Sequence, residues 1–289
     1  MKILVLGAGN VGRAVAAKLK KTGHEVVVTT TSENKVTELE DLAEHVFVLK
    51  GHESEKVLEA AKGCEAVIVC VAPSFKGATS SEDREKNYHQ TLVMSCQNAR
   101  NACEQVIFCS SFSVYGSGGE GVDPITEDTE IPLQAEPSAK YYYMAENEVL
   151  KAEMGCVLRF PDMYGAPKDH SYCDRLRLAH KFMGGKVPFS GNSPLYRLHY
   201  LDVTEALCHA VEESLSGVYN VCDNGSLPKT NKEIFDELAD SIKVPRLQFL
   251  DQIVSPNRKI SSQKIIDTGF NIKHTDQNGL VLEELGNLP

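Results

Sequence analysis

The sequence lacks the features that mark membrane, secreted and nucleic-acid-binding proteins. Its longest clean apolar run, Ala66 to Ala72, is far shorter than the roughly 20 residues that span a bilayer. The net charge is −10 and no stretch is rich in lysine or arginine, so we expect neither nucleic acid nor an anionic membrane as a partner. The start, MKILVLGAG, has no cleavage region and runs straight into glycines, so we predict no signal peptide and a cytoplasmic protein.

The sequence also lacks any Cys-x-x-Cys pair, although it contains nine cysteines. Their number is odd, they are dispersed, and Cys70, Cys109 and Cys156 lie in apolar runs. Cysteines of this kind are typical of buried, reduced side chains that pack as small hydrophobic groups. We therefore predict free thiols and no metal centre.

What the sequence does contain is an ordinary globular composition, with 42% hydrophobic and 24% charged residues in a chain of 289. A chain of this size buries roughly 75% of its unfolded surface. Short β-branched runs alternate with longer helical patterns, which predicts an α/β fold with a parallel sheet. We predict strands at 2–6, 25–29, 46–49, 66–71, 105–109 and 156–160, and helices at 11–21, 82–103, 140–153, 203–214 and 231–242.

Local signals mark several of the expected boundaries. Asp202-x-x-Glu205 and Thr230-x-x-Glu233 have the spacing of capping boxes, and Gly23 is placed to end the first helix. Residues 117–137 are rich in glycine, proline and acidic residues and show no periodicity, which predicts a mobile loop.

A glycine turn follows the first expected strand and opens the first helix. In GAGNVG, Gly7, Gly9 and Gly12 have the Gly-x-Gly-x-x-Gly spacing, with Asn10 and Val11 between them. The first glycine permits a tight turn, the second lets the backbone approach a pyrophosphate, and the third allows the helix to pack closely on the strand. We predict that this turn binds a dinucleotide; the alternative is a glycine turn without a ligand.

The end of the second expected strand bears on the choice of dinucleotide. An NAD-specific site usually has an acidic residue there for the ribose 2′-hydroxyl. This chain has Thr30, Thr31 and Ser32, with Lys35 close behind, and these groups favour NADP over NAD. The alternative is that Ser32 only caps the next helix.

Six later segments resemble landmarks of the extended short-chain dehydrogenases/reductases, the NAD(P)-dependent epimerase/dehydratase family, in the family's order. They are Asn87-x-x-x-Thr91, VIFCSSFSVYG (106–116), ITEDTEIP (125–132), LRFPDMYGAP (158–167), RLHYLDVTEAL (197–207) and GVYNVCDNG (217–225). The resemblance implies a Rossmann-type doubly wound parallel sheet with a small, mostly C-terminal substrate domain. It places the dinucleotide-binding domain at 1–160, with segments around 197–222 returning to it, and the substrate domain mainly at 161–289.

The resemblance also implies roles for individual residues. Ser111 would hydrogen-bond the substrate oxygen, Tyr115 and Arg197 would contact substrate, and Pro161 would lie by the nicotinamide. Further cofactor contacts would come from Val71, Ala72, Pro73 and Asn87. The alternatives are that Ser111 satisfies backbone at a strand end and that Arg197 forms a surface salt bridge.

The family's remaining signature, Tyr-x-x-x-Lys on the fifth helix, is not preserved. In the family, the ammonium lies beside the phenol because residues four apart share a helix face, and it lowers the pKa of the phenol. Here Tyr141 is followed at that distance by Ala145, and sliding by one residue pairs Lys140 with Met144. The one literal match, Tyr164 to Lys168, contains Gly165 and Pro167 and so belongs to a loop.

Two functions therefore stay open. In the first, the protein is an epimerase, dehydratase or reductase acting on a nucleotide sugar or similar hydroxyl or carbonyl compound, with Ser111, Lys140 and Tyr141 or Tyr143 as catalytic groups. In the second, the dyad is lost and the protein is a dinucleotide-binding regulator or sensor, as in the atypical YeeZ-like group. The tyrosines would then only pack between the helix and the acidic loop. The resemblance also allows a homodimer, because helices four and five of related proteins form a dimer bundle.

Overall fold

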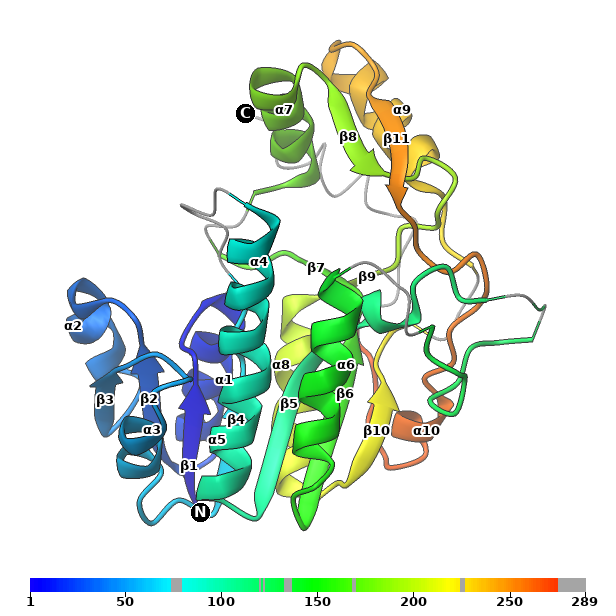
Figure 1. The fold of residues 1–289 in the computed structure, drawn as a ribbon. Helices are drawn as coiled ribbons and strands as arrows, with labels where there is room; N and C mark the ends of the chain where they lie inside the picture. Colours follow the sequence, from blue (N-terminus) through cyan, green and yellow to red (C-terminus); the bar gives the residue numbers. More distant parts are fainter. Residues whose placement is uncertain are drawn as a thin grey trace.

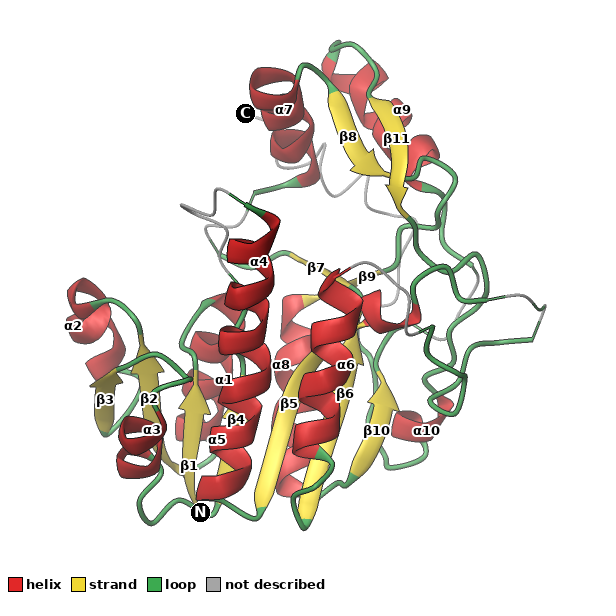
Figure 2. Cartoon of the chain, viewed as in Figure 1, coloured by secondary structure: helices red, strands yellow, loops and turns green. Residues whose placement is uncertain are grey.

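A seven-stranded parallel sheet forms the centre of the structure, a computed structural model that describes residues 1–73, 80–119, 121, 123–132, 137–167, 170–223 and 227–274. The strand order is β10-β6-β5-β4-β1-β2-β3 (Figures 1 and 2). The strands are β1 (Lys2–Leu6), β2 (Glu25–Thr30), β3 (His45–Val48), β4 (Ala66–Val69), β5 (Gln105–Ser111), β6 (Met154–Phe160) and β10 (Gly217–Asn220).

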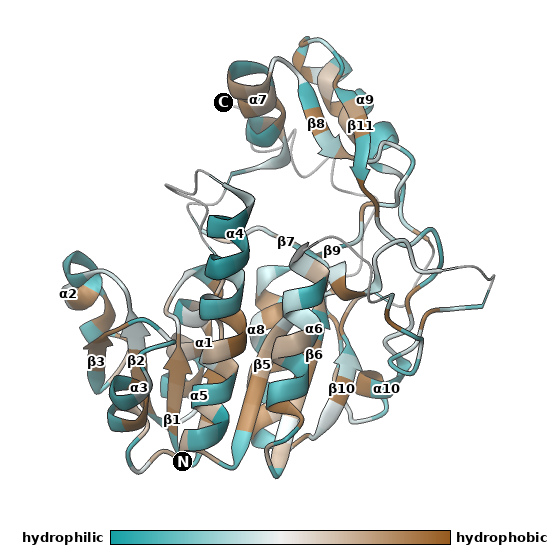
Figure 3. Ribbon diagram, in the orientation of Figure 1, coloured by the Kyte–Doolittle hydropathy of each residue, from teal (hydrophilic) through white to brown (hydrophobic). Residues whose placement is uncertain are grey.

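Helices cover both faces of this sheet, which explains why its strands read as continuous apolar runs. Along β1, Ile3 and Val5 belong to one hydrophobic core, while Leu4 and Leu6 belong to the other. The first core lies under α1 (Asn10–Lys21) and α8 (Tyr200–Glu212), and the second under α3 (Ser54–Ala60), α5 (Met94–Ala102) and α6 (Pro137–Val149). Figure 3 shows brown, apolar strands between helices whose outer sides are teal.

A smaller lobe stands above the carboxyl edge of the sheet (Figure 1). It contains α7 (Tyr172–Met183), β8 (Lys186–Phe189), α9 (Asn231–Ile242) and β11 (Gln248–Ile253), and it has a separate core around Leu176, Phe235 and Leu238. The short strands β7 (Asp162–Tyr164) and β9 (Arg197–His199) pair with each other between the lobe and the sheet. After β9 the chain continues through α8 to β10, which pairs with β6 at the edge of the seven-stranded sheet.

The remaining elements are short and complete the connections. They are η1 (Glu33–Lys35), α2 (Val36–Glu40), α4 (Ser81–Tyr88), η2 (His89–Val93), η3 (Phe112–Tyr115) and α10 (Gln263–Ile266). The predicted helix at 82–103 is thus α4 and α5 joined by the π-helical turn η2. Within the described parts of 117–132, the backbone forms no helix and no strand beyond an isolated bridge between Ile125 and Ile260, and α6 begins at the end of the predicted loop, at Pro137.

One predicted boundary is wrong and another is confirmed. The helix α8 begins at Tyr200 with His199 as its N-cap, so Asp202 lies inside the helix instead of capping it. Its carboxylate accepts hydrogen bonds from the backbone N–H groups of Lys273 and His274, both at 3.0 Å, a partnership that local sequence does not reveal. The Thr230 capping box at the start of α9 is confirmed.

All nine cysteines are free thiols, as predicted. Burial raises the pKa of Cys109 to about 12 and that of Cys64 to about 11. Among the described helices, none has both the length and the apolar character needed to cross a membrane.

Candidate functional site

The residues predicted to bind a dinucleotide gather at the carboxyl ends of the parallel strands. The strand order changes direction between β1 and β4, because β2 lies on one side of β1 and β4 on the other. In open α/β sheets, ligands bind at this kind of topological switch point. The glycine turn follows β1, Val71 to Pro73 follow β4, Ser111 ends β5, and Pro161 follows β6.

The glycine turn has the geometry that a pyrophosphate requires. Gly7 adopts a φ of +103°, which L-residues rarely adopt, and its N–H donates to Thr29 Oγ1 at 2.9 Å. A Cβ on Gly12 would lie 2.1 Å from the Gly7 carbonyl oxygen, so a side chain there would clash with the turn. A Cβ on Gly9 would meet nothing within 4 Å. The turn is therefore tightly packed at Gly12, where the helix meets the strand, and has open space beside Gly9.

The amino end of α1 completes this cradle. Gly9 is the N-cap and supplies no side-chain cap, so the first N–H groups of the helix, including those of Asn10 and Val11, are not capped by it. Unpaired N–H groups and the positive end of the helix dipole attract phosphate. The residues present therefore fit the diphosphate of a dinucleotide.

The residues after β2 are those predicted to lie beside the adenosine ribose. Ser32 precedes η1, but its side chain makes no cap hydrogen bond, so the interpretation of Ser32 as a cap is not supported. Its N–H donates to Thr30 Oγ1 at 3.3 Å, and Thr31 and Lys35 are exposed. The sequence did not single out Arg13, which follows the glycine motif directly and forms an ion pair with Glu38 of α2 at 2.8 Å.

The remaining predicted cofactor contacts have mixed exposure. Val71 adjoins the glycine turn, since a Cβ on Gly7 would lie 3.1 Å from Val71 Cγ1. Ala72 is exposed and Pro73 is half-buried. Asn87, on α4, is half-buried and accepts a hydrogen bond from Thr91 Oγ1 at 3.5 Å, whereas Pro161 is buried.

Ser111 stands where β5 ends and the turn η3 begins. Its Oγ accepts a hydrogen bond from the Ser113 N–H at 3.1 Å, so it caps η3 as the structural alternative expected. The hydroxyl is half-buried and its proton is not used by this bond. Ser111 can therefore still donate to a substrate oxygen.

Tyr115 is fully buried, at 0% exposure, and does not reach solvent in this conformation. Its phenol donates to Asn220 Oδ1 at 2.7 Å and accepts from Arg159 Nη1 at 2.8 Å. Burial raises its pKa to about 12, and the guanidinium offsets this only in part. The structure thus gives Tyr115 internal partners in place of the substrate contact that the resemblance implied.

A third register of the fifth helix, which the sequence did not single out, pairs a tyrosine with a glutamate at the spacing of the family's Tyr-x-x-x-Lys. Tyr142 and Glu146 are four residues apart on α6, and Tyr142 stacks on Phe108 of β5. The buried Glu146 carboxylate accepts from Ser110 Oγ at 2.6 Å and pairs with Arg159 at 2.8 Å. A carboxylate therefore stands four residues after the half-buried Tyr142, where the family signature has an ammonium.

Tyr141 lies on the side of α6 that contacts α4. Its phenol donates to Glu85 Oε2 at 2.9 Å, and its ring stacks on Tyr88 with an interplanar angle of 4°. Burial, followed by Glu85, raises the pKa of Tyr141, the opposite of the tuning that a general base needs. Lys140 lies over the Tyr141 ring, 5.2 Å from its centroid.

Tyr143 and Lys140 line one hollow of about 320 Å³ beside α6, together with Ile131, Pro132, Ala139, Met144 and Asn147. Tyr143 also packs against the apolar cluster that contains Phe112 and Tyr115, the turn that follows Ser111. The structure thus brings Lys140 and Tyr143 together and places Tyr143 near the serine loop.

Arg197 is 2% exposed, so it is neither a surface ion pair nor open to a substrate phosphate in this conformation. Its guanidinium lies over the Tyr164 ring, 4.3 Å from the ring centroid.

The literal Tyr-x-x-x-Lys match runs from Tyr164 to Lys168. Tyr164 ends the short strand β7, and Lys168 lies outside the described residues.

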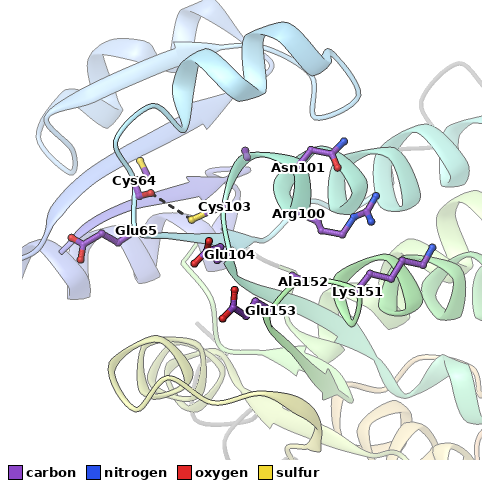
Figure 4. A pocket seen from close by; sticks show the side chains of 10 residues that line it. Cys64, Glu65, Arg100, Asn101, Cys103, Glu104, Lys151, Ala152 and Glu153 are labelled. Atoms are coloured by element: carbon purple, nitrogen blue, oxygen red, sulfur yellow. Dashed lines mark hydrogen bonds between the residues drawn. The ribbon is translucent and has the colours of Figure 1, made fainter.

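A second hollow, of about 690 Å³, opens at the amino ends of β4, β5 and β6, the edge opposite the glycine turn. Figure 4 shows Cys64, Cys103 and charged side chains around it, with the Cys103 thiol donating to the Cys64 carbonyl at 3.5 Å. No group of three or more metal-ligating side chains occurs among the residues whose positions are described.

The sheet order and the glycine turn after β1 define a Rossmann-type fold. Residues 3–222 match the "NAD dependent epimerase/dehydratase family". The chain belongs to this family.

Individual relatives are distant. A curated relative, the decarboxylating sterol-4-alpha-carboxylate 3-dehydrogenase of Dictyostelium discoideum, is 25% identical over 200 residues, and the match covers 62% of this chain and 60% of the relative. The structure of UDP-glucuronic acid 4-epimerase from Bacillus cereus with NAD superposes with a TM-score of 0.76 at 18% identity over 98% of both chains. UDP-glucose 4-epimerase from Thermus thermophilus with NAD gives 0.71 at 21% identity over 100% of both.

Proposed function

We propose that the protein is an NAD(P)-dependent epimerase, dehydratase or reductase that acts on a nucleotide sugar or a similar hydroxyl or carbonyl compound. The observation that carries the proposal is the shared edge of the sheet. There a glycine turn with open space above Gly9 lies two strands from the Ser111 hydroxyl. A dinucleotide held at the turn would extend along this edge towards Ser111 and supply hydride chemistry.

In this proposal the chain's own groups hold and polarise the substrate. The Ser111 O–H, which the bond from the Ser113 N–H does not use, donates a hydrogen bond to the substrate oxygen at the carbon that exchanges hydride. The packing of Tyr143 near the serine loop and its shared hollow with Lys140 favour Tyr143 as the proton relay. The hydrogen bond from Tyr141 to Glu85 disfavours Tyr141 in that role.

The proposed cofactor is NADP in preference to NAD. The hydroxyls of Thr30, Thr31 and Ser32 and the ammonium of Lys35 stand where an NAD-specific enzyme has a carboxylate.

The proposed partners of the protein are a small-molecule substrate and a second copy of the chain. The second copy would dock through α5 and α6, and light scattering would test for the dimer. Nine free thiols favour a cytoplasmic location.

A second candidate function is a dinucleotide-binding sensor without ordinary turnover. The specific observation in its favour is the absence of a lysine beside any of the three tyrosines at the dyad spacing. Burial moreover raises the pKa of both Tyr141 and Tyr142. Neither phenol is tuned for proton exchange near neutral pH.

A comparison of wild type with Ser111→Ala separates the two functions. UDP-sugars and dTDP-glucose would be incubated with the protein and either NADP or NAD, and products followed by mass spectrometry. Turnover that Ser111→Ala abolishes, with an unchanged dissociation constant for the dinucleotide by calorimetry, supports the enzyme. Dinucleotide binding without turnover by wild type on any of these compounds supports the sensor.

A further inference from the structure

We propose that Arg13, held by Glu38 beside the end of β2, is the residue that selects a dinucleotide carrying a 2′-phosphate. The inference rests on the proposed function, because it concerns the same dinucleotide site. It adds a selecting residue outside the threonine and serine run and a mechanism by which that residue is released.

Arg13 is placed for this task by the fold of the first βαβ unit. It lies in the first turn of α1, directly after Gly12, and so next to the phosphate cradle. Its Nη2 donates to Glu38 Oε2 at 2.8 Å, and Glu38 belongs to α2, which follows β2 and η1. The ion pair therefore ties the cradle to the segment that would border the adenosine ribose.

The ion pair is exposed enough to exchange partners. The Arg13 side chain is 27% exposed and that of Glu38 is 55% exposed, and pairs in such surroundings are weak because water screens both charges. A phosphate monoester carries a charge near −2 at neutral pH and accepts the two parallel N–H bonds of a guanidinium. It would therefore outcompete the single carboxylate for Arg13.

The neighbouring groups suit such an exchange. The charged side chains of η1 are Glu33 and Lys35, so the ammonium of Lys35 offsets the carboxylate of Glu33. The Ser32 side chain makes no cap bond and can donate to a phosphate oxygen. A 2′-hydroxyl has no charge with which to displace Glu38, so with NADH the guanidinium stays on its carboxylate and contributes little.

The test measures dinucleotide binding and needs no turnover. Dissociation constants for NADPH and NADH would be measured by calorimetry for wild type, Arg13→Ala, Glu38→Gln and Lys21→Ala. Lys21 is exposed in the last turn of the same helix, so Lys21→Ala removes one positive charge far from the cradle and serves as the matched control. Circular dichroism would verify that each variant is folded.

We expect Arg13→Ala to weaken NADPH binding roughly ten- to hundredfold and NADH binding less than about threefold, as for loss of a charged hydrogen bond. Glu38→Gln should strengthen NADPH binding, and Lys21→Ala should change neither ligand. Three results would overturn the inference about Arg13 and leave the proposed function standing. They are equal losses of NADPH and NADH affinity in folded Arg13→Ala, no loss of affinity for either ligand, and a preference of wild type for NADH. If wild type bound neither ligand, the proposed function would fail as well.

Discussion

The buried ion pair of Glu146 and Arg159 is the residue-scale feature that most shapes the proposed catalytic region. Arg159 donates both to Glu146 and to the Tyr115 phenol, and Glu146 also accepts from Ser110. One buried pair thus anchors the polypeptide on both sides of Ser111. Removing one partner would leave an uncompensated buried charge, which is costly.

We expect Arg159→Met alone to lower the free energy of unfolding by about 3 kcal/mol or more, measured by urea titration. The double variant Glu146→Leu with Arg159→Met should recover much of this loss, because it removes both charges. A single variant as stable as wild type would show that the pair is not buried as described.

Tyr115 supplies a prediction on pH. Its pKa is raised from 10.0 to about 12, mainly by burial, so the folded state keeps a proton that the unfolded state loses between these values. The contribution of Tyr115 to the free energy of unfolding should therefore be fully present below pH 10. It should fall by about 2 to 3 kcal/mol as the pH rises to 12. Urea titrations at pH 9 to 12 should show a shallower decline for Tyr115→Phe than for wild type. Parallel declines would contradict the assignment.

At the scale of the element, the glycine turn separates stability from binding. A Cβ on Gly12 would lie 2.1 Å from the Gly7 oxygen, whereas a Cβ on Gly9 would enter open space. Gly12→Ala should therefore lower the melting temperature. Gly9→Ala should leave it nearly unchanged and weaken dinucleotide binding at least tenfold, because the methyl group would occupy the volume proposed for the pyrophosphate. Undiminished binding by Gly9→Ala would place the ligand elsewhere.

The elements were also the level at which the sequence was most informative. Every predicted sheet strand is present, since strands covered on both faces need long apolar runs and this pattern is local. The start of α8 was mispredicted because the true partners of Asp202 are backbone groups about 70 residues away in the sequence. The same limitation hid Glu38 as the partner of Arg13.

At the scale of the whole molecule, dinucleotide binding should stabilise the fold. A ligand that binds only the folded state at a hundred times its dissociation constant adds about 2.7 kcal/mol. We expect NADPH to raise the melting temperature by several degrees in a thermal-shift experiment and Gly9→Ala to abolish most of that rise. Equal rises in both proteins would argue against binding at the turn.

The sequence by itself determined the parallel α/β fold, the glycine turn and the loss of the Tyr-x-x-x-Lys dyad, because each depends on residues within one element or at fixed spacing. Only the tertiary structure decided that Tyr115 and Arg197 are buried, that Tyr141 bonds to Glu85, and that Glu146 pairs with Arg159. Those outcomes depend on which helix faces meet which strands. Long-range packing sets that relation, and no local pattern in the chain encodes it.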